Sequence, residues 1–146
     1  MATDKTTMVN RALTLLGCRP IVNLETDDTP ESRTMNNLYD SALEEILTDV
    51  KWTFSTKRAL LALTSDTVPF NTVGQTLSFV YQRPVDCLRI FEVSDVAADW
   101  YEEEDKIISD TANLGIIYSF FNKNPATYKP YFATAFSDYL ASLAAF

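Results

Sequence analysis

The sequence predicts an α+β protein, a helical bundle with a small antiparallel β domain inserted between the second and third helices. Two changes of periodicity along the 146-residue chain predict this order. Apolar residues recur at helical spacing up to Val50, whereas Trp52 and Phe54 alternate as the residues of a strand do. Helical spacing returns after Pro125. The expected bundle therefore comprises residues 1–51 plus 124–146, and the expected β lobe comprises residues 52–123.

Length and composition fit one domain or two small lobes that share a boundary. With 47% hydrophobic and 22% charged residues, the chain can fold around an ordinary core without disulfide or metal support. No apolar run approaches the roughly 20 residues needed to span a bilayer. Asp4, Asn10 and Arg11 interrupt the apolar stretch near the N-terminus, so we expect no signal peptide and synthesis in the cytoplasm of the cell that makes the protein.

Residue types that are missing exclude most enzyme classes. The chain has no histidine, which removes the usual general base, and only three glycines, which cannot build a phosphate-binding loop. Cys18 and Cys87 match no metal-ligand spacing and are expected to be reduced, buried thiols. A net charge of −8 disfavours a protein that grips nucleic acid. We therefore expect no enzymatic activity and no cofactor.

The first two helices have clear start and stop signals. The first should run from about residue 7 to residue 16, and Gly17 supplies the left-handed residue that commonly ends a helix. An ordered loop follows, in which Ile21, Val22 and Leu24 fold back onto the helices. The second helix should begin with Thr29 as its cap and Pro30 in its first turn. Its apolar stripe is wide enough to contact two other helices, as in a bundle. That stripe consists of Met35, Leu38, Tyr39, Ala42, Leu43, Ile46, Leu47 and Val50.

The middle of the chain is typical of β structure. Short runs of aromatic and branched residues are separated by turn formers: WTFSTKRALLAL, TLSFVY, CLRIFEV, ADWYEEE, KIISD and LGIIYSFF. The piece RALLAL could equally be a helical turn. The charged tip Glu103, Glu104 and Asp105 predicts a hairpin. Such closely spaced runs favour a small antiparallel sheet or sandwich.

The third helix follows Asn124 and Pro125. Its expected apolar face comprises Phe132, Ala135, Phe136, Tyr139, Leu140 and Leu143. The sequence then ends on Phe146 without a glycine, a basic last turn or a polar tail. This ending predicts either that the molecule continues further or that a neighbouring molecule covers this end.

Five segments carry a resemblance to a known family. They are NRALTLLGCRPIVNLETDD, RTMNNLYDSALEEILTDVKWTFSTKRALLAL, FVYQRPVDCLRIFEV, the hairpin of residues 101–110, and IIYSFFNKNPATYKPYFATAFSDYLASLAA. In this order they resemble the head-to-tail adaptor family of short-tailed bacteriophages, also called tail tubular protein A. The most specific pieces are residues 49–54 (DVKWTF), followed by Lys57 and Arg58, and residues 81–89 (YQRPVDCLR).

The resemblance implies a structural protein of the virion, located at the head-to-tail junction. Family members resemble a helical bundle with an inserted β domain, form a dodecameric ring below the portal protein, and carry the tail nozzle protein on the other face. Genomic DNA passes through the lumen without specific binding, and no membrane is involved. Members usually continue through a further helix and an extended tail, whereas this sequence stops inside the expected third helix.

Candidate interface residues fall into two groups. Lys57, Arg58, Arg83 and Arg89 could pair with acidic surfaces of the portal or nozzle, although scattered basic residues on a sheet are usually its solvated face. Phe132, Phe136, Tyr139 and Phe146 are most simply bundle core, but a groove left by a missing helix would let an adjacent subunit cover some of them. Trp52 and Phe54 are expected to be core anchors that fix the β lobe to the second helix.

Acidic residues allow three interpretations. The set consists of Asp27, Asp28, Glu102, Glu103, Glu104 and Asp105. A pair of carboxylates is enough for glycoside hydrolysis, but adjacent acids at a helix start or hairpin tip are usually solvated or capping. In a ring they could instead face the lumen and repel DNA.

Two alternative functions stay open, a tail component with a lytic glycan hydrolase activity and a free-standing soluble binding module.

Overall fold

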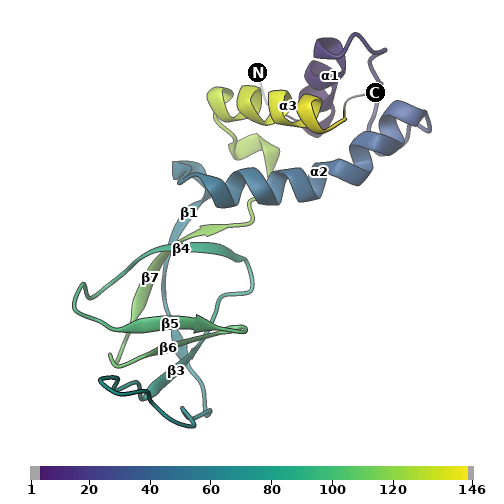
Figure 1. Ribbon diagram of the computed structural model, residues 1–146. Helices are drawn as coiled ribbons and strands as arrows, with labels where there is room; N and C mark the ends of the chain where they lie inside the picture. The colour runs from purple at the N-terminus through teal and green to yellow at the C-terminus, as the bar shows by residue number, and fades with distance from the viewer. Residues whose placement is uncertain (1–3, 145–146) are drawn as a thin grey trace. The chain divides into compact units, whose positions relative to one another are not determined.

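The protein is a mixed α+β chain. The computed structural model describes residues 4–144, which form three α-helices and two antiparallel β-sheets (Figure 1). The chain divides into two compact units. The helical unit takes the chain up to Val50 and again from Asn122 onward, and the β unit is Lys51–Phe121. The boundaries expected from the sequence, after residues 51 and 123, lie one and two residues later than these.

Side-chain caps fix the starts of the first two helices. Helix α1 (Lys5–Leu15) begins two residues before the expected start because the Asp4 carboxylate accepts a hydrogen bond from the Thr7 amide at 2.6 Å. Gly17 follows it with φ 72°, the left-handed conformation expected of this glycine. Helix α2 (Pro30–Asp49) begins with Thr29 as its cap and Pro30 in its first turn, as predicted.

The loop between these helices is ordered by two asparagines. The Asn10 side chain both donates to the carbonyl and accepts from the amide of Ile21, each at 2.8 Å, and Asn36 donates to the Leu24 carbonyl. These bonds hold Ile21 and Leu24 in the core. Val22 was also expected to fold back, but its side chain is 90% exposed, and its backbone amide donates to the Asp27 carboxylate at 2.8 Å.

Helix α3 (Pro130–Ala144) packs against both α1 and α2 (Figure 1). Aromatic side chains contribute to this contact. The rings of Phe132 and Phe136 are stacked at 5.9 Å, and Tyr39 meets Phe136 edge-on at 5.1 Å. Leu143 was expected on this face, but it is 42% exposed, while Ser137 and Ala141 are buried instead. The buried stripe is therefore rotated relative to the predicted one, because the small residues allow close helix approach.

The β unit contains two antiparallel sheets where the sequence predicted one sheet or a sandwich. Strands β1 (Thr56–Leu60), β7 (Gly115–Phe120) and β4 (Cys87–Val93) form the first sheet in that order. The second has the order β2 (Ala62–Leu63), β3 (Phe79–Gln82), β6 (Lys106–Ser109) and β5 (Trp100–Glu103). The ambiguous piece RALLAL is extended and changes sheet at Leu61, which is buried.

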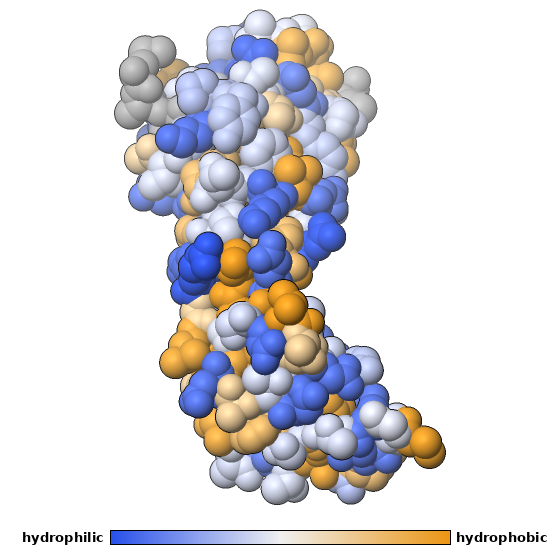
Figure 2. Space-filling view, turned by 90° about the vertical axis from the view of Figure 1, so that its left-hand side faces the viewer, coloured by the Kyte–Doolittle hydropathy of each residue, from blue (hydrophilic) through white to orange (hydrophobic). Residues whose placement is uncertain are grey.

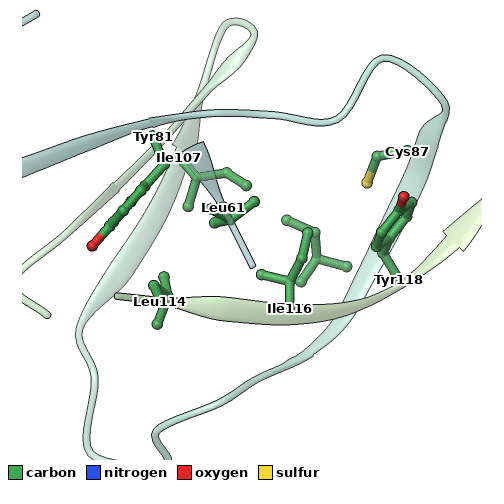
Figure 3. Packing of buried hydrophobic residues seen from close by; sticks show 8 residues of the cluster. Leu61, Tyr81, Cys87, Ile107, Leu114, Ile116 and Tyr118 are labelled. Carbon is green, nitrogen blue, oxygen red and sulfur yellow. The ribbon is translucent and has the colours of Figure 1, made fainter. Parts of the chain in front are cut away.

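The core of the β unit lies where residues of both sheets meet. Eight buried side chains form it (Figure 3): Leu61, Tyr81, Cys87, Ile90, Ile107, Leu114, Ile116 and Tyr118. A smaller cluster of Leu77, Val80 and Ile108 packs with Val68 from the loop between β2 and β3. The four-stranded sheet thus buries side chains on both of its faces, because strand residues alternate in direction.

Trp52 and Phe54 do not occupy a strand, and this part of the prediction is wrong. Residues Thr53–Ser55 form a 3₁₀ turn that is closed on the Trp52 carbonyl, which accepts from the Ser55 amide at 3.0 Å and from the Thr56 hydroxyl at 2.7 Å. The turn removes the expected alternation and leaves both aromatic side chains half-buried, with ring centroids 6.2 Å apart.

Candidate functional site

Lys57 lies in a charged cluster on the three-stranded sheet. Its Nζ is 2.5 Å from Asp86 Oδ2 and 4.2 Å from the centroid of the Phe120 ring, while Asp86 Oδ1 accepts from the Tyr118 hydroxyl at 3.0 Å. Burial would raise the pKa of Asp86, but the hydrogen bonds from Lys57 and Tyr118 outweigh it and hold the pKa below its usual value. Lys57 is therefore engaged within its own chain.

Arg83 and Glu102 belonged to different candidate groups in the sequence, yet they pair with each other. Arg83 Nε is 3.2 Å from Glu102 Oε2, and Arg83 Nη2 donates to the Leu88 carbonyl at 3.2 Å. These contacts join the loop after β3 to strand β5. Arg83 thus holds this loop in place, a role that the sequence did not indicate because the two residues are separated by 19 positions.

Arg58 and Arg89 are exposed residues of the three-stranded sheet. Arg58 lies on β1, beside an apolar groove at the end of the sheet, and the guanidinium of Arg89 lies 5.6 Å from the Phe91 ring centroid. Lys57 is exposed as well, whereas Arg83 is half-buried. Exposure alone therefore disfavours only Arg83 as an interface residue.

The six acidic candidates are divided between the two units and do not form one site. Asp27 accepts from the Val22 amide at 2.8 Å, and Asp28 pairs with Arg33 at 2.6 Å, so both organise the loop before α2. Glu102 pairs with Arg83, and Asp105 lies 3.1 Å from Lys106 Nζ. Glu103 and Glu104 are exposed at the β5–β6 hairpin, with Glu104 at φ 54° in its turn.

The titration behaviour of the carboxyls bears on the glycan hydrolase interpretation. A general acid for glycoside hydrolysis needs a raised pKa. Hydrogen bonds from Lys106 and Gln82 instead lower the pKa of Asp105, and hydrogen bonds lower that of Asp110 as well. Within residues 4–144, no cluster of three His, Cys, Asp or Glu side chains could hold a metal ion.

The two cysteines are free, as expected. Burial raises the pKa of the Cys87 thiol to about 11, and Cys87 lies beside Tyr118 in the core of the β unit (Figure 3). Cys18 is only half-buried, in the turn after α1. A thiol with such a raised pKa is a poor nucleophile at neutral pH, so Cys87 acts as a packing residue.

The aromatic candidates of α3 need a correction. Phe132 and Phe136 are fully buried within the helical unit, so they offer no surface to an adjacent subunit. Tyr139 is half-buried, and its hydroxyl donates to the Glu45 carboxylate of α2. Phe146 lies outside the described residues. Sequence periodicity could not separate core from interface here, because both are apolar.

Two surface grooves of the β unit were not predicted. The sheet-end groove encloses about 260 Å³ and is lined by Arg58, Leu60, Val93, Ser94, Ile116 and Ile117. The β5 groove encloses about 430 Å³ and is lined by Val68, Phe70, Leu77, Tyr101, Glu103 and Ile108. In the lower half of Figure 2, hydrophobic residues reach the surface of the β unit among hydrophilic ones. Phe70 is exposed and lies between Pro69 and Asn71 in a turn sequence. A large aromatic residue within a turn was the one sequence feature that could have indicated the β5 groove.

The described residues thus define an α+β protein with intramolecular ion pairs and two apolar surface grooves. None of the described helices has the length and hydrophobicity of a membrane span. A scan of the sequence against protein-family models gave no match. A search of curated proteins also gave none.

Proposed function

We propose that this protein is a head-to-tail adaptor, a non-enzymatic structural protein of a short-tailed bacteriophage virion. Its ring would join the portal protein to the tail nozzle and extend the channel through which DNA is ejected. The single observation that carries the proposal is the order of the five segments that resemble the adaptor family along nearly the whole sequence. In this proposal the three helices form a bundle into which the β domain is inserted.

The most specific of those segments coincide with structural junctions. Residues 49–54 span the boundary between the two units, which falls after Val50. Residues 81–89 contain the end of β3, the loop held by Arg83 and Asp86, and the start of β4. A resemblance that falls on structural junctions is consistent with a requirement of the fold, and this supports the family resemblance over a chance similarity of exposed loops.

Charge fits a channel protein. The net charge of −8 opposes tight binding of phosphates, so DNA can pass close to the ring without adhering. The alternative of a lytic glycan hydrolase has less support, because the six acidic candidates are divided between the two units, and Asp28 and Glu102 are paired with Arg33 and Arg83. A turnover assay on peptidoglycan and capsular polysaccharide, with purified protein, checks that alternative directly.

Assembly with the portal protein tests the proposal. The purified chain is mixed with the portal of the same phage, and the complex is analysed by mass photometry and electron microscopy. We expect a second ring stacked coaxially on the portal ring. If the mass and the electron-microscopy image of the portal ring stay unchanged in the presence of excess protein, the proposal is contradicted.

A further inference from the structure

The β5 groove is a preformed surface whose wall is fixed to the sheet. The wall is the segment of residues 64–78, which connects β2 to β3. The Asn71 side chain accepts from the Leu77 amide at 2.9 Å and donates to the Leu77 carbonyl at 3.0 Å, which closes the segment into a loop. The Ser78 amide donates to the Ser109 carbonyl at 3.1 Å and fastens the loop to β6. The groove is therefore largely formed before any partner binds.

The groove follows the open edge of a strand. Strand β5 is the last strand of the four-stranded sheet, with β6 on one side. Tyr101, Glu102 and Glu103 all line the groove, although consecutive strand residues point to opposite faces. The groove therefore runs along β5, which among the described strands pairs only with β6. An extended segment placed there can pair with the free backbone groups of β5, as in strand addition.

The floor and wall of the groove are apolar. Phe70 is 77% exposed and Tyr101 is 44% exposed, and Leu77 and Ile108 also line the groove, with Thr72 and Gln75 as polar exceptions. A volume of about 430 Å³ is within the range of sites that hold a ligand of a few side chains. The groove can accordingly accept an aromatic or branched side chain as an anchor.

The charge of the groove selects among occupants. Glu102 and Glu103 line it, no lysine or arginine does, and Arg83 offsets only Glu102. Glu104 and Asp105 extend the acidic rim beyond the strand, with Asp105 paired to Lys106. Like charges facing each other destabilise strand pairs, so the edge of β5 resists a second β5 strand. A basic segment is attracted to this acidic rim, whereas an acidic segment is repelled.

We propose that the β5 groove binds an extended segment of a partner protein, in which an aromatic or branched anchor is flanked by lysine or arginine. The segment adds along the edge of β5, places its anchor between Phe70 and Tyr101, and sets its cations against Glu103. This inference rests on the groove alone and holds whether or not the protein is an adaptor.

Three end-capped peptides test it against the full chain: Ac-KLKFKVK-NH₂, its acidic counterpart Ac-ELEFEVE-NH₂, and Ac-KSKSKSK-NH₂, which keeps the charge without the anchors. Two-dimensional NMR of the ¹⁵N-labelled protein follows each titration. We expect the first peptide to bind about tenfold more tightly than either of the others, with shifts confined to residues 64–78 and 100–109. Equal binding of the acidic or the serine peptide, shifts spread over the molecule, or no binding at about 1 mM peptide would overturn the proposal.

A matched pair of charge reversals separates the groove from general electrostatics. Glu103→Lys should weaken binding of the first peptide about fivefold or more, whereas Glu92→Lys, which makes the same charge change at an exposed site on β4, should leave it within about twofold. Both variants are first checked for an unchanged native NMR spectrum away from the substitution. Tyr101→Phe, which keeps the ring, should retain binding, and Tyr101→Ser should lose it. Equal weakening by Glu103→Lys and Glu92→Lys would overturn the proposal.

Discussion

The Tyr118 hydroxyl donates a hydrogen bond to the carboxylate of Asp86 at 3.0 Å. The other oxygen of that carboxylate binds Lys57, and the Asp86 carbonyl accepts from the Phe121 amide at 2.9 Å. Asp86, the residue directly before β4, therefore contacts both β1 and β7, so it connects the three strands of one sheet. Asp86 belongs to the YQRPVDCLR segment, directly before Cys87. Its contacts therefore give a structural role to an aspartate at this position of the segment.

Replacing Asp86 by Asn should lower the free energy of unfolding at pH 7 by about 1 kcal/mol, because the ion pair with Lys57 is partly exposed and screened by solvent. The variant keeps an acceptor for Tyr118. Since the folded-state pKa of Asp86 lies below its ordinary value of 3.8, the ionic contribution is complete above that value and is lost as the pH falls through the folded pKa. Urea unfolding at a series of pH values measures the difference.

The free energies of unfolding of the wild type and Asp86→Asn should accordingly converge at acidic pH. A gap between the wild type and Asp86→Asn that stays constant down to about pH 2 would contradict the assigned role of the carboxylate. Adding salt at neutral pH provides a control, because it should narrow the gap by screening the exposed pair.

The helical unit should depend strongly on Phe132. Phe132→Ala removes a fully buried ring that stacks on Phe136, so we expect a loss of about 3–5 kcal/mol in the free energy of unfolding. Leu143→Ala, on the exposed side of the same helix, should change it by less than about 1 kcal/mol. Thermal and urea denaturation compare the two variants. Similar losses for both would show that the buried stripe of α3 is assigned incorrectly.

The two thiols should differ in reactivity. Burial raises the pKa of Cys87 to about 11, so few of these thiols are ionised at pH 8, and access is blocked by the core. With a thiol reagent such as DTNB, we expect one rapid reaction in the native protein, at Cys18, and a second only in urea. Cys18→Ser should abolish the rapid phase. A rapid phase that persists in this variant would place Cys87 at the surface.

Local sequence signals predicted the regular elements well. Thr29 and Pro30 marked the start of α2, and Glu103, Glu104 and Asp105 marked the β5–β6 turn, because caps and turns depend on residues close in sequence. Trp52 and Phe54 misled the prediction. Their alternation resembles a strand, whereas hydrogen bonds to the Trp52 carbonyl form a turn that hydrophobic periodicity cannot reveal.

The surface could be predicted far less well than the elements. Arg83 and Glu102 were assigned to separate groups, and only the pairing of strands brings them within 3.2 Å of each other. The β5 groove depends on how residues 64–78 fold over the sheet, which has no periodic signature. Contacts between residues distant in sequence are a property of the tertiary fold, so sequence patterns identified charged residues without their partners.

Cryo-electron microscopy of intact virions is the most direct test of the proposed head-to-tail adaptor function. We expect a ring of this chain directly below the portal, with its helical and β units both fitted by density and the DNA channel running through its centre. Density for other proteins at that position, with this chain absent from the head-to-tail junction, would contradict it.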